Sequence, residues 1–180
     1  MHLPGTKPER IEPPAEPDVE VRIRGLMMDP STQSPVVVLN DIGGEVVLPI
    51  WVGIFEANAI ALQLENVETP RPMTHDLLKS AISQLDGRVT RIVIHDLRDS
   101  TFFAQIRMMV NRAGSDTMLE LDARPSDAIA LALRTEAPIY VAQSVLDQAQ
   151  TITPDAEDQE EKTKKWFENL DTEDLGKYKM

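Results

Sequence analysis

The chain has 180 residues, which is enough for one domain with a full hydrophobic core and short for two. It has no cysteine, which excludes disulfides, thiolate metal sites and a cysteine nucleophile. No apolar run reaches transmembrane length and residues 1–5 lack a signal peptide's apolar region, so we expect a cytosolic protein with no membrane partner.

The formal net charge is −12, and its distribution limits the partners. Residues 1–18 contribute −2 and residues 153–180 contribute −4, which leaves −6 for the part between them. Such a surface repels phosphate backbones and disfavours non-specific binding of nucleic acid. A nucleic-acid partner would therefore need a local arginine cluster or a metal ion.

The composition divides the chain into three segments. Residues 1–18 are rich in proline and glutamate and are expected to form a disordered arm. Residues 19–152 carry the periodic apolar patterns of a folded domain. Residues 153–180 begin as an acidic linker and end in a short tail that contains Trp166 and Phe167.

The apolar spacing predicts strands at 19–24, 36–39, 45–48, 89–97, 101–110, 119–122 and 138–142. It predicts helices at 55–66, 74–86 and 126–134 and a last one from Ser144. Runs of strands joined by short hairpins, with helices between them, indicate an α+β fold. We expect a single compact domain in which a mixed or antiparallel sheet packs with three or four helices. Pro49 places the strand at 45–48 at an edge or a bulge.

Two of the predicted helices, at 55–66 and 126–134, have more apolar surface than one small sheet readily covers, and this is the basis for a prediction of self-association. The helices at 55–66 and 126–134 are apolar around most of their circumference. The helix at 74–86 has a clear stripe, formed by Leu77, Leu78, Ala81, Ile82 and Leu85, with Thr74 as a candidate cap. We therefore predict a homodimer or larger oligomer that buries an apolar surface or an edge strand.

The stretch from 119 to 133 organises the rest of the chain. Alternation at 119–122 predicts a strand, and the apolar run after Pro125 predicts a buried helix. The residue before a proline favours extended backbone, and proline is tolerated in the first helical turn. Ser126 and Asp127 can cap this helix, so Asp122 and Arg124 lie near them at a strand–helix junction.

Two further junctions have a similar composition. Arg71-Pro72 opens the helix at 74–86, and residues 49–57 place Glu56 at the start of another helix. If the junctions converge, one pocket is surrounded by Glu56, His75, Asp76, Asp122 and Asp127, with Arg71 and Arg124 beside it. Glu56, Asp122 and Asp127 would suit Mg²⁺ or Mn²⁺, and the arginines would hold phosphate. His75 would act as base or ligand, and Asp76, Asp122 and Asp127 join it as catalytic candidates.

The alternative interpretation is structural. Acids at helix starts are favoured by the helix macrodipole, and a lone histidine there is often only a cap. The chain has no G-x-G-x-x-G, P-loop or H-E-x-x-H motif, and no organic cofactor is expected.

The three junction motifs resemble the bifunctional nuclease domain family over about residues 19–150. They read LPIWVG followed by EANAI at 48–60, RPMTHDLL at 71–78, and DARPSDAIALA at 122–132. The resemblance implies a compact α+β domain that often self-associates, with DNase and RNase activity attributed to some members, whereas many bacterial members were long of unknown function. It supplies no catalytic residue set, so the site residues above rest on the residues themselves.

Our leading hypothesis is a cytosolic, metal-assisted nuclease that hydrolyses phosphodiester bonds of DNA or RNA. The alternative is a non-catalytic binding or regulatory domain that acts through self-association. The acidic surface favours the alternative, because a processive nuclease would need a basic track.

Overall fold

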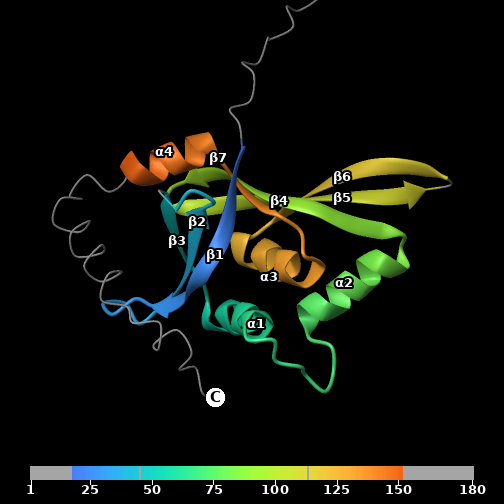
Figure 1. Cartoon of the computed structure of the whole chain (residues 1–180), viewed down its shortest axis with the longest axis horizontal. Helices are drawn as coiled ribbons and strands as arrows, with labels where there is room; N and C mark the ends of the chain where they lie inside the picture. Colours follow the sequence, from blue (N-terminus) through green and yellow to red (C-terminus); the bar gives the residue numbers. More distant parts are fainter. Residues whose placement is uncertain (1–17, 45, 113, 152–180) are drawn as a thin grey trace, which may run out of the picture.

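The computed structural model describes residues 18–44, 46–112 and 114–151, without the side chains of residues 112, 150 and 151. Seven strands form one sheet and four helices pack around it (Figure 1). The strands are β1 (Asp18–Met28), β2 (Pro35–Asp41), β3 (Val47–Trp51), β4 (Gly87–Arg98), β5 (Thr101–Arg112), β6 (Ser115–Ala123) and β7 (Ile139–Ala142). The helices are α1 (Ile54–Leu64), α2 (Thr74–Gln84), α3 (Pro125–Thr135) and α4 (Gln143–Thr151).

The sheet is mixed, which confirms the predicted α+β class. Its strand order is β3-β2-β1-β7-β4-β5-β6. Two antiparallel meanders, β1-β2-β3 and β4-β5-β6, are joined through β7, which pairs antiparallel with β1 and parallel with β4. Pro49 lies in β3, an edge strand that pairs only with β2, so its missing N–H costs the sheet no hydrogen bond on the open side.

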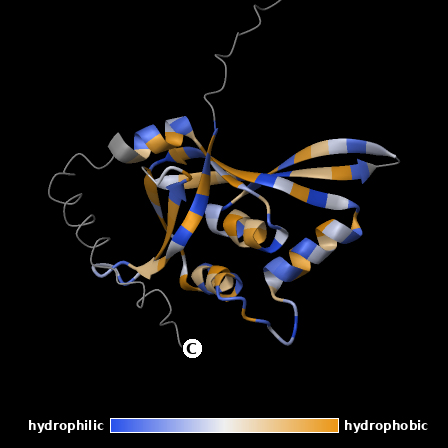
Figure 2. Ribbon diagram, in the orientation of Figure 1, coloured by the Kyte–Doolittle hydropathy of each residue, from blue (hydrophilic) through white to orange (hydrophobic). Residues whose placement is uncertain are grey.

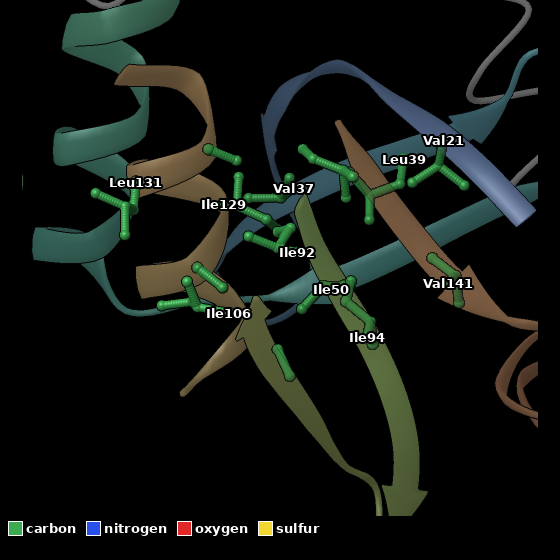
Figure 3. Packing of buried hydrophobic residues seen from close by; sticks show 14 of the residues in the cluster. Val21, Val37, Leu39, Ile50, Ile92, Ile94, Ile106, Ile129, Leu131 and Val141 are labelled. Carbon is green, nitrogen blue, oxygen red and sulfur yellow. The ribbon is translucent and has the colours of Figure 1, made fainter. Parts of the chain in front are cut away.

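The core lies between the sheet and α3 (Figure 3). Ile92 and Ile94 of β4 are fully buried, as are Ile129 and Leu131 of α3. The run Ala128–Ala132 is buried throughout, because α1, α2 and the sheet all contact α3. The apolar run after Pro125 therefore forms the predicted buried helix.

The helices are divided between two locations. Figure 1 shows α1, α2 and α3 grouped beneath β4, β5 and β6, with α4 apart from them beside β7. Figure 2 shows hydrophobic residues along most of α1 and α3 and a mixture on α2. Within the described ranges, no helix is both long enough and apolar enough to cross a membrane.

The apolar stripe of α2 forms as predicted but stays largely uncovered. Leu77, Leu78, Ala81 and Leu85 are exposed, and only His75 of this helix is buried. The helix contacts α3 and β4 along its inner side, where Ile82 packs against the core, and the rest of the stripe is left exposed. Thr74 is the first helical residue, and the N-cap is Met73.

The expected N-terminal arm and the C-terminal linker and tail lie outside the described residues. Asp18 is an exception within the predicted arm, because it begins β1 and pairs with Ala142 of β7.

Candidate active site

The starts of α1, α2 and α3 share one feature of sequence. Each helix carries an acid at its third residue, namely Glu56, Asp76 and Asp127. The macrodipole favours a negative charge there. Only Asp76 uses its carboxylate as a cap, since the Met73 backbone N–H donates to its Oδ2 at 2.8 Å. The other two carboxylates bind side chains from other parts of the chain.

Four side chains at the helix starts are linked by hydrogen bonds in one network, which we call the junction cluster. They are Glu56, Arg124, Asp127 and His75. Arg124 donates to Asp127 through Nε at 2.7 Å and Nη2 at 3.1 Å. Its Nη1 donates to Glu56 Oε1 at 2.9 Å. His75 Nε2 lies 3.2 Å from Asp127 Oδ1. The helix starts therefore converge in space, which is the condition on which the sequence-based site depended.

Local backbone geometry explains why Arg124 can reach both acids. Arg124 is the N-cap of α3 and is extended, with φ −68° and ψ 144°, as expected for a residue before proline. Its side chain therefore leaves the helix start instead of following the helix. The α1 side of the cluster depends on Gly53, because a Cβ there would lie 2.2 Å from Glu56 Oε2.

A buried arginine supports the cluster from the interior. Arg134 is only 5% exposed, and its Nε donates to Asp76 Oδ1 at 2.6 Å. Its Nη1 donates to the carbonyl oxygens of Ala59 in α1 and Ala130 in α3, at 3.1 and 2.9 Å. Arg134 thus ties three helices together next to His75. We did not predict it, although a single arginine within an apolar helix was a usable signal for a buried ion pair.

The charges of the cluster stabilise one another. Burial alone would raise the pKa of the Asp127 carboxyl, but hydrogen bonds from Arg124 and His75 outweigh it and hold that pKa below its ordinary value. Asp127 in turn raises the pKa of Arg124, with Glu56 adding to the effect. The pKa of Asp76 is also lowered: burial opposes this shift, and the Met73 N–H and Arg134 dominate it. All three groups are therefore charged at neutral pH.

Three of the predicted site residues are outside the cluster: Asp76 adjoins it through Arg134 and the Met73 N–H, whereas Asp122 and Arg71 lie apart from it. Asp122 is exposed on β6, opposite Gln105 of β5. Leu121 pairs with buried Ile106, and side chains alternate between the faces of a strand, so Asp122 points away from the helices. Arg71 is exposed in the loop before α2, and its guanidinium has no partner within the described part of the chain.

The proposed metal ligands Glu56, Asp122 and Asp127 do not fit a cation in this arrangement. Arg124 already pairs with both Glu56 and Asp127, and a cation between them would have to displace its guanidinium. Asp122 faces the other side of the sheet. Across residues 18–44, 46–112 and 114–151, no three acids or histidines lie close enough to hold a metal ion.

Comparisons with known proteins agree with the motifs at these junctions. The model of the bifunctional nuclease domain matches residues 37–154, which include all four cluster residues. An uncharacterized protein of Mycobacterium tuberculosis is 41% identical over 144 residues, which cover 80% of this chain and 84% of that protein. Bifunctional nuclease 2 of Oryza sativa subsp. japonica is 28% identical over 124 residues, 68% of this chain and 38% of the rice protein. The chain belongs to the bifunctional nuclease domain family.

Proposed function

We propose that this protein hydrolyses phosphodiester bonds of nucleic acid at the junction cluster. The observation that carries the proposal is the contact between His75 and Asp127, with an exposed arginine bonded to the same carboxylate. A histidine oriented by a carboxylate is a common general base, and an adjacent guanidinium suits a phosphate. Two rice relatives are named bifunctional nucleases, which supports this reaction class.

In the proposed mechanism His75 is the general base. Its Nε2–H donates to Asp127, which leaves the lone pair on Nδ1 free to accept a proton. Nδ1 has no hydrogen-bond partner in the described ranges, and the largely buried His75 side chain keeps 11% of its surface exposed. Asp127 fixes the ring and stabilises the imidazolium that forms.

Arg124 binds the phosphate in this mechanism. A guanidinium has five N–H donors, and the two acids take three of them. The side chain is 65% exposed, so the remaining two donors can reach a ligand in solvent. Glu56 and Asp127 hold the guanidinium plane in a fixed orientation, which reduces the entropy lost when phosphate binds.

The reaction needs no group beyond these residues and water. His75 Nδ1 takes a proton from water while the oxygen bonds to phosphorus, and the bond from phosphorus to one nucleotide oxygen breaks. Solvent supplies the proton that the departing oxygen requires. We assign no step to Mg²⁺ or Mn²⁺, because the carboxylates that would bind the ion are held by Arg124.

A second function is favoured by one observation, the exposed stripe of α2. Large exposed apolar patches mark interaction surfaces. The net charge of −12 also opposes a nucleic-acid track. On this alternative the protein is a non-catalytic binding or regulatory domain that acts as a homo-oligomer.

The experiment that separates the two is cleavage of end-labelled RNA and DNA by highly purified parent, His75→Gln and Arg124→Ala. A general base contributes about 100- to 10,000-fold, so His75→Gln should lose at least 100-fold in kcat. Arg124→Ala should mainly raise KM. Assays with EDTA and with added Mg²⁺ or Mn²⁺ test the absence of a cation step. Cleavage that is equal in all three proteins comes from a contaminant and supports the binding domain.

A further inference from the structure

An exposed aromatic side chain adjoins the junction cluster. Phe55, the second residue of α1, is 85% exposed, more than any other large hydrophobic side chain in the described part of the chain. A phenylalanine gains nothing for folding at such a position. Its backbone directly precedes Glu56, which binds Arg124. The ring is therefore attached within one residue of the proposed phosphate site.

A side-chain amide that can form hydrogen bonds with a nucleobase lies on the same side of α1. Asn58 follows Phe55 by three residues, so the two side chains are neighbours on the helix surface. Asn58 is exposed, and its amide has no partner among residues 18–44, 46–112 and 114–151. An amide can both donate to and accept from the edge of a nucleobase.

We propose that Phe55 is a stacking platform for a base of a single-stranded nucleic acid, with Asn58 beside it as the group that contacts the base edge. The inference rests on the proposed phosphodiesterase function and names its substrate class. Every base has a π face, and single strands are commonly held by stacking on aromatic side chains next to cationic groups. In a duplex each base is already stacked and paired, so Phe55 selects single strands.

Charge complementarity favours this occupant over a second copy of the chain. The exposed guanidinium of Arg124 lies beside the first turn of α1 and attracts a phosphate, as a strand of nucleic acid would provide. A second copy would bring its own Arg124 to the same place in a two-fold contact, and like charges oppose that pairing.

Binding is measured by fluorescence anisotropy with a short fluorescein-labelled oligothymidylate. The proteins carry His75→Gln, and a gel confirms that the probe stays intact. Phe55→Ala should weaken binding about 5- to 150-fold, the range of one stacked base, and Phe55→Tyr should keep most of the affinity. Ile42→Ala is the matched control, because Ile42 is also an exposed apolar side chain but lies in the β2–β3 turn. It should bind like the parent.

Two other probes make the proposal specific. The same sequence as a duplex, and a single strand that lacks bases, should bind weakly and should not respond to Phe55→Ala. The proposal would be overturned if the Phe55→Ala protein bound the single strand as tightly as the protein that keeps Phe55. So would a parent oligomer that Phe55→Ala alone dissociates, since the ring would then bind protein.

The outcomes also separate this inference from the proposed function. Loss of cleavage in His75→Gln, together with unchanged binding and KM in Phe55→Ala, would leave the function standing and remove the stacking site. Single-strand binding that depends on Phe55, in a protein that cleaves nothing, would support the stacking site and contradict the function.

Discussion

Arg134 Nε donates to Asp76 Oδ1 at 2.6 Å, and the two residues are buried unequally. The arginine side chain is 4% exposed and the aspartate side chain is 33% exposed. Asp76 is adjacent to His75 in α2, and Arg134 also bonds α1 through the Ala59 carbonyl. This pair therefore fixes the first turn of α2, which carries the proposed base, against its neighbours.

The unequal burial predicts unequal costs of breaking the pair. Asp76→Asn leaves a buried guanidinium without its counter-charge, which should cost about 3–5 kcal/mol of unfolding free energy. Arg134→Met leaves a carboxylate that water can still reach, and this should cost about 1–3 kcal/mol. Urea unfolding measures both. Equal losses of unfolding free energy, or a larger loss for Arg134→Met, would contradict this account. They would show that an unpaired Arg134 guanidinium costs no more than an unpaired Asp76 carboxylate.

Lowering the pH should reduce the free energy of unfolding, because it protonates Asp76 and Asp127. The pKa values of Asp76 and Asp127 are lowered in the fold, because hydrogen bonds and nearby cations outweigh the effect of burial. Folding therefore releases protons from these groups, and their contribution is complete above the unfolded value, about 3.9. It is lost as pH falls through and below that value.

Unfolding free energies of the parent and of Asp127→Asn, measured from pH 6 down to pH 3, check this. The parent should lose stability more steeply than Asp127→Asn on the acid side. Parallel curves would show that Asp127 ionises alike in the folded and unfolded states.

Gly53 should be required for the α1 side of the cluster. Any Cβ at this position would lie 2.2 Å from Glu56 Oε2, so Gly53→Ala must move the Glu56 carboxylate. We expect a small change in stability, about 1 kcal/mol or less, because the atom that must move is the far end of a flexible side chain. KM for nucleic acid should rise in Gly53→Ala and in Glu56→Gln alike, because in both variants Glu56 no longer orients Arg124. A Gly53→Ala protein with parent kinetics would indicate that Glu56 does not orient Arg124.

The stripe of α2 should mediate self-association. Ala81 lies midway between Leu77 and Leu85, four residues from each, so two copies of α2 paired antiparallel about a two-fold axis would place each Leu77 against the partner's Leu85. The sequence-based expectation of an oligomer rested on the helices at 55–66 and 126–134, but α3 is buried within the fold, so we propose the α2 stripe as the interface. Leu77→Glu with Leu85→Glu should give a monomeric mass in light scattering, whereas exposed Met118→Glu on β6 should not.

A parent that is monomeric at micromolar concentration would contradict this pairing. A parent oligomer that persists in the double variant would place the interface elsewhere, for example at the β6 edge.

The sequence predicted most of the fold because its local signals agreed with the tertiary structure. The Arg124-Pro125 start and the apolar run after it identified α3, and Pro49 indicated an edge or a bulge, of which the structure shows the edge. Composition singled out the three helix starts, but neither their convergence nor the pairing of their side chains follows from a local pattern. Which acid binds which cation depends on contacts such as Arg124 with Glu56, 68 positions apart, that no local pattern encodes.

The Asp122 assignment shows a signal that was present and not used. The alternation of Leu121 with Asp122 already implied that Asp122 faces away from the core. The alternation of side chains along β6 does not fix the direction of Arg124, because the strand ends at Ala123 and α3 begins at Pro125. Arg134 follows the apolar run of α3 as its one cation, and a lone cation in such a helix indicates a buried ion pair.

The measurement that tests the central claim most directly compares Asp127→Asn with Asp122→Asn in cleavage of a single-stranded RNA. Both changes remove one carboxylate near the start of α3, but only Asp127 contacts His75 and Arg124. We predict that Asp127→Asn lowers kcat by about 100-fold or more while Asp122→Asn stays within a few fold of the parent. A large loss in Asp122→Asn, with Asp127→Asn unaffected, would contradict the proposed site.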